Sequence, residues 1–358
     1  MAIPRGKRAL TPKDRENRKH YLYATLITCL VLVMIGSTLH VIKLGAGRMD
    51  EMRKLVSYDI KDENSRVRAA GEEITLQRKH EYGKPSSNQG YTVAEAERLL
   101  SREQWEDLDA MVKIPAGKFI MGTNLERADA QDKPQHTVFL PTYYIDKYLV
   151  TNAQYARFVA ATGHRPPLNW KNGLIPEGEL LYPVTMVTWY DAKAYAKWAH
   201  KRLPTEAEFE KAGRGSDGRR WPWGNNMEPN RLNTYYNVGS ASNVTTYRNG
   251  ASPYGLLDMS GNVDEWMADD FLPYEGSKAP TDLFQGKVSV VATAEERTLK
   301  LSEQRAVSQR YKVLRGGSWK GDPFSTSLFH RNFSFANHAS DFYGFRCASD
   351  ANGHASKP

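Results

Sequence analysis

The chain has 358 residues, of which 40% are hydrophobic and 25% are charged. This length suits one large domain or two ordinary ones. The net charge of +8 is concentrated at one end: of 49 basic and 41 acidic residues, eight and two lie in residues 1–43, which leaves 41 and 39 in residues 44–358. Because the bulk of the chain is nearly neutral, we expect no nucleic-acid partner.

An apolar run near the N-terminus, Tyr21 to Ile42, contains no Asp, Glu, Lys or Arg. A helix of this length measures about 33 Å, enough to cross a bilayer. Seven basic residues precede the run, and the positive-inside rule then places the N-terminus in the cytoplasm. We expect residues 1–20 to form a basic cytoplasmic tail and residues 21–43 a single-pass anchor in the lipid bilayer of the inner membrane, with the main domain periplasmic. A signal peptide cleaved near residues 44–47 is the alternative.

Residues 44–110 are rich in charge and poor in aromatic side chains, which is typical of a stalk or linker. Within this segment Thr92 and Glu95 have the spacing of a capping box, which predicts a short helix through about Trp105. The chain has two cysteines. Cys29 lies inside the predicted anchor and Cys347 near the C-terminus, so we expect no intrachain disulfide.

From Met111 the pattern changes to short strands followed by helices, an α+β arrangement. Segments 112–122 and 136–145 predict short antiparallel strands, since apolar residues alternate or run together between Gly and Pro. Three later helices are predicted where a threonine is followed three residues on by a side chain that can complete a capping box. Their expected starts are Thr151, Thr188 and Thr205.

The second half of this domain shows little regular periodicity. Residues 214–254 contain almost no regular run, and a compact fold there needs something else to order it. Residues 270–310 form a charged insertion in which residues 293–301 could be helical, and residues 351–358 form a tail. Sequence alone therefore predicts a domain with few regular elements.

Four oxygen-bearing side chains lie close together after this irregular stretch. They surround Gly261, and a hard cation such as Ca²⁺ could use them together with backbone carbonyls. Clusters of Asp, Asn and Gly are also ordinary turn material, so residue chemistry leaves a solvated loop equally open. The four residues are Asp258, Asn262, Asp264 and Glu265.

Eight strings, in order along the chain, resemble the formylglycine-generating enzyme (sulfatase-modifying factor) domain. The resemblance covers about residues 111–350, and it implies a C-type-lectin-like fold with little regular secondary structure and with bound Ca²⁺. The strings are Ile114–Gly122, Ile145–Tyr155, Pro183–Trp189, Lys201–Glu208, Trp223–Asn225, Tyr254–Trp266, Leu314–Trp319 and Gly344–Ala348.

The resemblance also implies the calcium ligands. One site would use the side chains of Asp258 and Glu265 with the carbonyls of Gly261 and Val263. A second site would begin with Asn233 and the carbonyl of Thr234. The segment that should complete the second site, residues 236–248, lacks the acidic residues usual in the family.

The chemistry of the enzyme does not carry over from the resemblance. Catalytic members hold copper(I) with two cysteines, at the second and seventh positions after the residue equivalent to Trp319. Those positions here are Gly321 and Thr326. Because soft Cu(I) needs sulfur ligands, we expect no copper and no catalytic residue. Related iron-dependent sulfoxide synthases use a histidine cluster in an N-terminal helical domain, whereas residues 44–110 contain only His80.

Aromatic and polar side chains interleave between Trp319 and His338, a mixture typical of a recognition face. His330 and His338 could also be imagined as an acid–base pair, although histidines among aromatics are more often structural. The predicted recognition surface consists of Trp319, Asp322, Phe324, Phe329, His330, Arg331 and His338.

These observations favour a non-catalytic, membrane-anchored extracytoplasmic binding or scaffold module. It would be an accessory, regulatory or assembly subunit whose partners are other membrane or periplasmic proteins. Two alternatives stay open: an oxygen-dependent oxidoreductase with a non-cysteine metal site in the same cleft, and a receptor for a glycan or peptide. We further expect substitutions at Gly316, Gly317 or Arg346 to unfold the domain, and alanine at Gly321 or Thr326 to leave it folded.

Overall fold

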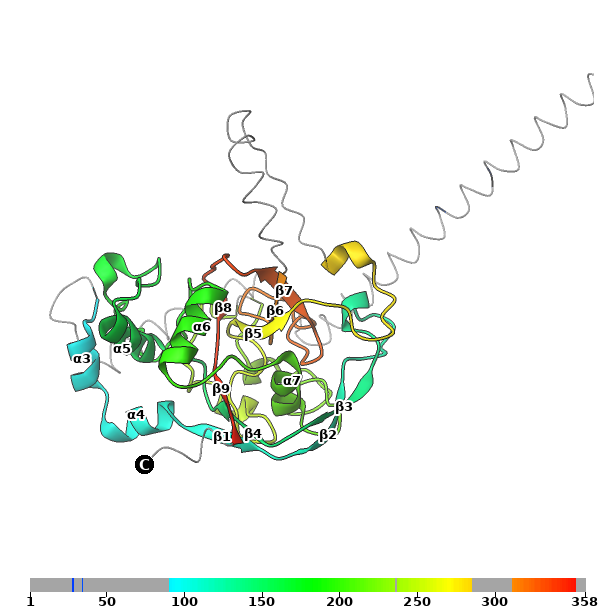
Figure 1. The fold of residues 1–358 in the computed structure, drawn as a ribbon, viewed down its shortest axis with the longest axis horizontal. Coiled ribbons are helices and arrows are strands. Elements are labelled where there is room, and N and C mark those ends of the chain that lie inside the picture. The colour runs from blue at the N-terminus through cyan, green and yellow to red at the C-terminus, as the bar shows by residue number, and fades with distance from the viewer. Residues whose placement is uncertain (1–27, 29–33, 35–89, 236, 285–310, 352–358) are drawn as a thin grey trace, which may run out of the picture. The chain divides into compact units, whose positions relative to one another are not determined.

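The computed structural model describes Thr28, Met34 and residues 90–235, 237–284 and 311–351 (Figure 1). Among the helices of these described residues, none combines the length and the apolar character that a membrane crossing requires. Several predicted segments lie outside the described part of the chain: residues 1–20, the anchor 21–43 apart from Thr28 and Met34, the stalk up to residue 89, the insertion 285–310 and the tail 352–358.

The described domain begins before the predicted boundary at residue 111. Two helices replace the single one expected there, α3 (Val93–Leu99) and α4 (Arg102–Leu108). They are separate because Leu100 is extended and Ser101 opens a second capping box. Apolar side chains from both helices are buried in the core that also holds α5 and α6, so residues 91–108 are part of the folded domain rather than of a stalk.

The short strands predicted in segments 112–122 and 136–145 are present, and the strands of the described residues form three small sheets. β1, β4 and β9 pair antiparallel, β2 and β3 form a hairpin, and a third sheet has the order β7-β6-β5-β8, in which β5 and β8 are parallel. The strands are β1 Met111–Ile114, β2 Gly117–Met121, β3 His136–Leu140, β4 Tyr143–Asp146, β5 Asp264–Asp270, β6 Tyr311–Arg315, β7 Asn332–Phe335, β8 Tyr343–Gly344 and β9 Ala348–Asp350.

The three predicted helix starts are confirmed. Complete capping boxes at Thr151, Thr188 and Thr205 open α5 (Asn152–Thr162), α6 (Trp189–Trp198) and α7 (Glu206–Arg214). α7 packs against β2, β3, β5 and β6, which places its acidic side chains beside the third sheet. Short 3₁₀ turns complete the fold: η1 Ala130–Asp132, η2 Lys171–Gly173, η3 Pro229–Arg231, η4 Arg248–Gly250 and η5 Thr281–Phe284.

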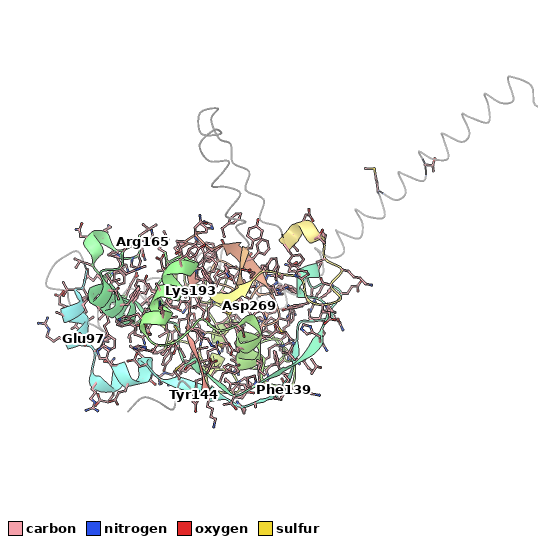
Figure 2. All side chains as sticks on the ribbon, viewed as in Figure 1. Glu97, Phe139, Tyr144, Arg165, Lys193 and Asp269 are labelled. Atoms are coloured by element: carbon pink, nitrogen blue, oxygen red, sulfur yellow. The ribbon has the colours of Figure 1, made fainter. Side chains whose placement is uncertain are left out.

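Between α7 and β5 the structure is irregular, as predicted. The described residues of this stretch contain no α-helix and no extended strand, only η3 and η4. Apolar side chains nevertheless pack into buried clusters, and Figure 2 shows the described side chains on the ribbon. One apolar cluster is centred on stacked Tyr155 and Tyr195, with Phe345 against both, and another surrounds Phe209 and Met259.

Candidate functional site

The segment from Arg315 to Cys347 begins with two glycines that the backbone requires. Gly316 and Gly317 have φ angles of 94° and 70°, a left-handed conformation that disfavours other residues. A Cβ atom on Gly317 would lie 2.8 Å from the carbonyl oxygen of Ser325. The close approach holds the loop that follows β6 against its own start, which positions both Gly321 and Thr326.

Gly321 and Thr326 are built into this loop by hydrogen bonds. The Gly321 carbonyl accepts from the Thr234 hydroxyl at 2.8 Å and from the Tyr235 N–H at 2.9 Å. Thr326 is fully buried, and its hydroxyl donates to the Pro323 carbonyl at 2.7 Å while accepting from Trp221 Nε1 at 3.1 Å. The Thr326 side chain is therefore a structural hydrogen-bonding group with no exposed surface.

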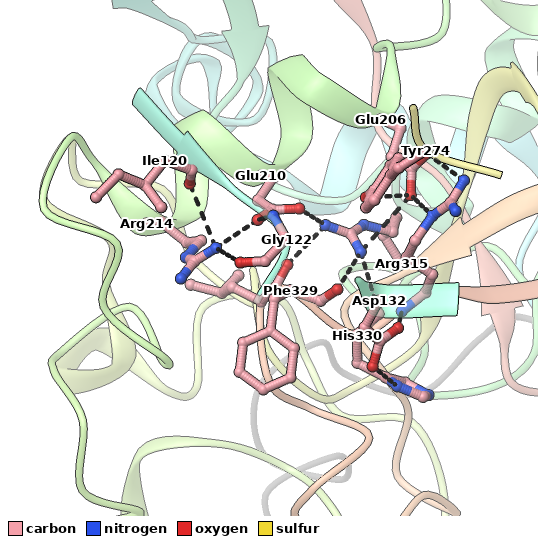
Figure 3. Close-up of polar contacts among 12 residues, drawn as sticks. Ile120, Gly122, Asp132, Glu206, Glu210, Arg214, Tyr274, Arg315, Phe329 and His330 are labelled. Carbon is pink, nitrogen blue, oxygen red and sulfur yellow. Dashed lines mark hydrogen bonds and ion pairs between the residues drawn. The ribbon is translucent and has the colours of Figure 1, made fainter. Parts of the chain in front are cut away.

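A buried ionic group, which we name the arginine cluster, fixes the other end of the loop (Figure 3). Arg315 pairs with Glu210, and Arg331 holds Glu206 with two bonds of 2.6 and 2.9 Å. The three guanidinium groups pair with the carboxylates of Glu206 and Glu210, and Asp132 joins the cluster by accepting from the Arg331 backbone N–H. The cluster consists of Arg214, Arg315, Arg331, Asp132, Glu206 and Glu210.

The prediction of one continuous recognition surface is wrong. Trp319, Phe324, Phe329 and Arg331 are all buried, each at most 7% exposed. Phe324 and Phe329 pack with Ala128 in a small apolar cluster, and Arg331 is engaged with Glu206. Apolar burial and ion pairing have thus drawn these side chains inward.

The remaining members of the predicted surface do not form a face either. Asp322 accepts hydrogen bonds from the N–H groups of Phe324 and Ser325 at 2.7 and 2.9 Å, which makes it a turn residue. His338 is exposed and lies 3.0 Å from the Ser334 hydroxyl. His330 is 12% exposed and faces Asp132. The two histidines therefore have separate partners, and no contact between them supports an acid–base pair.

The predicted calcium loop has an unusual backbone. Asp258, Gly261 and Asn262 all have positive φ angles, and a Cβ on Gly261 would lie 2.5 Å from the Asn233 carbonyl oxygen. Asn262 joins the two predicted sites, since its side chain donates to Asp258 Oδ2 at 2.9 Å and accepts from the Ser242 N–H at 2.9 Å. The loop therefore brings the first ligands of both sites into one hydrogen-bonded network.

Two oxygen atoms in this network lack a hydrogen-bond partner among the described residues: Asp258 Oδ1 and Asn233 Oδ1. Buried polar atoms are rarely left in this state, because each costs about 1–3 kcal/mol. They belong to the residues expected to begin the two calcium sites. Glu265, by contrast, has both oxygens paired with Arg346, at 2.7 and 2.8 Å.

The charges around the loop do not balance. Glu265 is paired with Arg346 and Asp146 with Lys201, whereas Asp258 and Asp264 form no ion pair with any residue that the structure describes. Burial raises the pKa of Asp258 to about 7 and that of Asp264 to about 6. Two buried carboxyl groups therefore lack a protein cation.

Sequence reasoning missed the arginine cluster. Glu206 and Glu210 are one turn apart on α7, and two of their partners, Arg315 and Arg331, follow more than 100 residues later. The spacing of Glu210 and Arg214 is a local signal for an ion pair on one helix face, but it does not indicate burial or the contacts with distant arginines.

Comparison with known proteins identifies the domain. The profile of the family described as sulfatase-modifying factor enzyme 1-like domain matches residues 96–351. The chain belongs to this family. The predicted resemblance is confirmed, and the match includes α4 and most of α3, in agreement with the early start of the fold.

Three curated relatives illustrate the range of sulfatase-modifying factor domains. The chain is 33% identical over 258 residues to serine/threonine-protein kinase pkn1 of Chlamydia caviae, covering 66% of this chain and 37% of the relative. It is 32% identical over 303 residues to formylglycine-generating enzyme of Streptomyces coelicolor, covering 67% and 89%. It is 29% identical over 299 residues to inactive C-alpha-formylglycine-generating enzyme 2 of Mus musculus, covering 68% and 86%. The chain thus spans well under half of the length of the kinase.

Among solved structures, PvdO from Pseudomonas aeruginosa has the same fold. The TM-score is 0.52 at 26% sequence identity, and the match covers 68% of this chain and 95% of PvdO. The mixed α and β architecture of the family is therefore shown for this chain.

Proposed function

We propose that this sulfatase-modifying factor domain is a non-catalytic binding module, anchored in the inner membrane through residues 21–43. It would serve as an accessory, regulatory or assembly subunit of a membrane or periplasmic complex. The observation that carries the proposal is the pair Gly321 and Thr326, which stand where catalytic members of the family carry copper-binding cysteines. Neither residue has a sulfur atom to offer Cu(I).

The surroundings of these positions support the proposal. Thr326 is committed to Trp221 and Pro323. Cys347, the cysteine within the described residues, is fully buried, and burial raises the pKa of its thiol well above the ordinary value. A thiol in that setting is a poor nucleophile and a poor copper ligand.

The relatives also fit a module without catalysis. The mouse relative is named as inactive, and the chlamydial relative carries the matching region as part of a longer protein. The Streptomyces relative is named as an enzyme, so family membership alone does not decide the function. The proposal that the domain lacks catalysis therefore rests on Gly321 and Thr326, at the positions that the family resemblance matches to the copper-binding cysteines.

Calcium is proposed as the structural cation of this module. Asp258 Oδ1 needs a partner, and the carbonyls of Gly261 and Val263 lie in the same loop. Glu265 can contribute only the lone pairs that its pairing with Arg346 leaves. Asn233 Oδ1 and the Thr234 carbonyl would begin the second site. A bound divalent ion would supply the two positive charges that the surrounding carboxylates lack.

A copper titration tests the absence of catalysis. The wild-type chain is titrated with Cu(I) against a chelating dye beside the double variant Gly321→Cys/Thr326→Cys, and both are assayed for oxidation of a cysteine peptide. We expect stoichiometric copper only in the double variant. Stoichiometric copper binding, or peptide oxidation, by the wild-type chain would overturn the proposal.

The subunit role is tested by purification of the full chain in mild detergent under several conditions. A stoichiometric protein partner that dissociates only under harsh conditions is the expected result. If the chain elutes as a lone monomer in every condition, the subunit role is rejected, while the copper result still decides the question of catalysis.

A further inference from the structure

A cluster of three potential metal ligands lies where the loop after β2 meets the chain just before β7. Asp129 is the N-cap residue of η1 and Asp132 is its last residue, and His330 comes from the segment that begins at Arg315. His330 Nδ1 lies 3.2 Å from Asp132 Oδ2 and 3.8 Å from Asp129 Oδ2, and the ligand atoms all lie within 4.8 Å of one another. Figure 3 shows His330 beside Asp132.

The surrounding fold holds these groups in position. Asp132 is fully buried, and its second oxygen, Oδ1, accepts from the Arg331 N–H at 2.9 Å. The Asp132 carbonyl accepts from the Thr123 N–H, and the His330 N–H donates to the Ser327 carbonyl. Asp129 occupies the N-cap position of η1 but makes no side-chain capping bond there. The cluster is therefore positioned by both of the segments that it joins.

The spacing of the three groups is that of ligands around one ion. His330 Nδ1 lies 3.2 Å from Asp132 Oδ2 and 3.8 Å from Asp129 Oδ2. Two ligand atoms bound to one zinc ion at a tetrahedral angle are about 3.3 Å apart, which lies between these two distances.

We propose that Asp129, Asp132 and His330 bind a divalent ion of the zinc class. Imidazole nitrogen with carboxylate oxygens suits Zn²⁺, whereas Ca²⁺ and Mg²⁺ favour oxygen alone and Cu(I) favours sulfur. The Asp129 side chain is 37% exposed, which leaves a coordination position for water. The ion would clamp the loop of residues 122–135 to the segment that begins at Arg315.

Zinc binding to the full chain tests the proposal. Protein without a polyhistidine tag is stripped with EDTA, returned to buffer with excess Ca²⁺, and titrated with Zn²⁺ by calorimetry and with Co²⁺ by visible absorption. We expect one tight equivalent that raises the thermal unfolding midpoint. Losing an outer hydrogen-bond partner of a metal ligand lowers metal affinity about 10–100-fold. His330→Gln and Asp129→Asn each remove a proposed ligand, so each should lower the zinc affinity by more than this.

Asp341→Asn is the matched control, since this exposed carboxylate pairs with Lys320 and should leave zinc binding unchanged. Circular dichroism in EDTA checks that each variant folds. If His330→Gln does not fold, Asp129→Asn decides, because Asp129 is partly exposed. The proposal is overturned if the wild type binds no zinc in the micromolar range, or if binding survives both variants.

Discussion

The arginine cluster and the calcium loop are both buried and charged, yet only the first is complete. In the arginine cluster each of the three arginines pairs with Glu206 or Glu210, and a single nitrogen, Arg315 Nε, lacks a partner among the described residues. In the calcium loop, Asp258 and Asp264 have no ion pair in the described part of the chain, and Asp258 Oδ1 has no hydrogen bond.

The difference distinguishes a structural network from a site that needs a ligand. A buried charge without a counter-charge costs several kcal/mol, and proteins avoid it by pairing or by binding a metal. The arginine cluster can therefore fold without help. In the calcium proposal, a divalent cation supplies the positive charge that the loop lacks.

Removing Arg346, the arginine that pairs with Glu265, should cause the largest loss of stability. Arg346→Met leaves Glu265 buried with no partner, and we expect a loss of about 3–5 kcal/mol in the free energy of unfolding, measured with urea. Adding Glu265→Gln should restore part of the loss, because both charges are then removed. A loss below about 1 kcal/mol would show that the pair is not buried as described.

Calcium removal should separate the two regions. At a Ca²⁺ concentration of 100 times Kd the ion stabilises the folded chain by about 2.7 kcal/mol, and EGTA should remove this gain. Asp258→Asn should reduce the response to EGTA, because it removes a ligand of the first of the two proposed sites. The response of Glu210→Gln, in the arginine cluster, should stay like that of the wild type. An EGTA response in Asp258→Asn as large as that of the wild type would contradict the assigned ligand.

Asp191 provides a buried carboxylate that the protein neutralises without metal. Burial raises the pKa of Asp191, but hydrogen bonds from Arg165, Thr188 and His164 outweigh burial and lower it to about 2. A lowered folded-state pKa stabilises the fold above the unfolded pKa near 4, and the gain is lost as the pH falls through about 2.

Asp191→Asn should therefore cost about 2 kcal/mol at pH 7, measured by urea unfolding. The difference from the wild type should shrink below pH 4 and vanish near pH 2. Adding Ca²⁺ should change neither the cost at pH 7 nor its dependence on pH. A difference that is independent of pH would show that the charge of Asp191 contributes nothing.

Effects of similar or smaller size are expected at Gly321 and Thr326. Thr326→Ala leaves Trp221 Nε1 buried without its acceptor, which should cost about 1–3 kcal/mol. Gly321→Ala brings a Cβ to 2.5 Å from the Ser325 hydroxyl, a side chain that can rotate away, and should cost about 1 kcal/mol or less. Urea unfolding of both variants compares them. Equal losses would contradict the buried hydrogen bond of Thr326.

The sequence predicted features whose physical causes are local. A capping box joins residues three apart, so Thr151, Thr188 and Thr205 marked the three helices correctly. The family resemblance predicted the fold and pointed to Asp258 and Asn233, whose buried side-chain oxygens lack hydrogen-bond partners among the described residues. A second capping box at Ser101 is a signal of the same local kind. It separates α3 from α4, where the sequence pattern predicted a single helix.

Only the tertiary structure decided which polar side chains are buried and what they face. The spacing of Trp319, Phe324, Phe329 and Arg331 is compatible with a surface, but apolar packing and the ion pair with Glu206 draw them inside. His330 meets Asp132 across 198 residues of chain. No local pattern encodes such a contact, because its geometry depends on how strands and loops from distant segments pack.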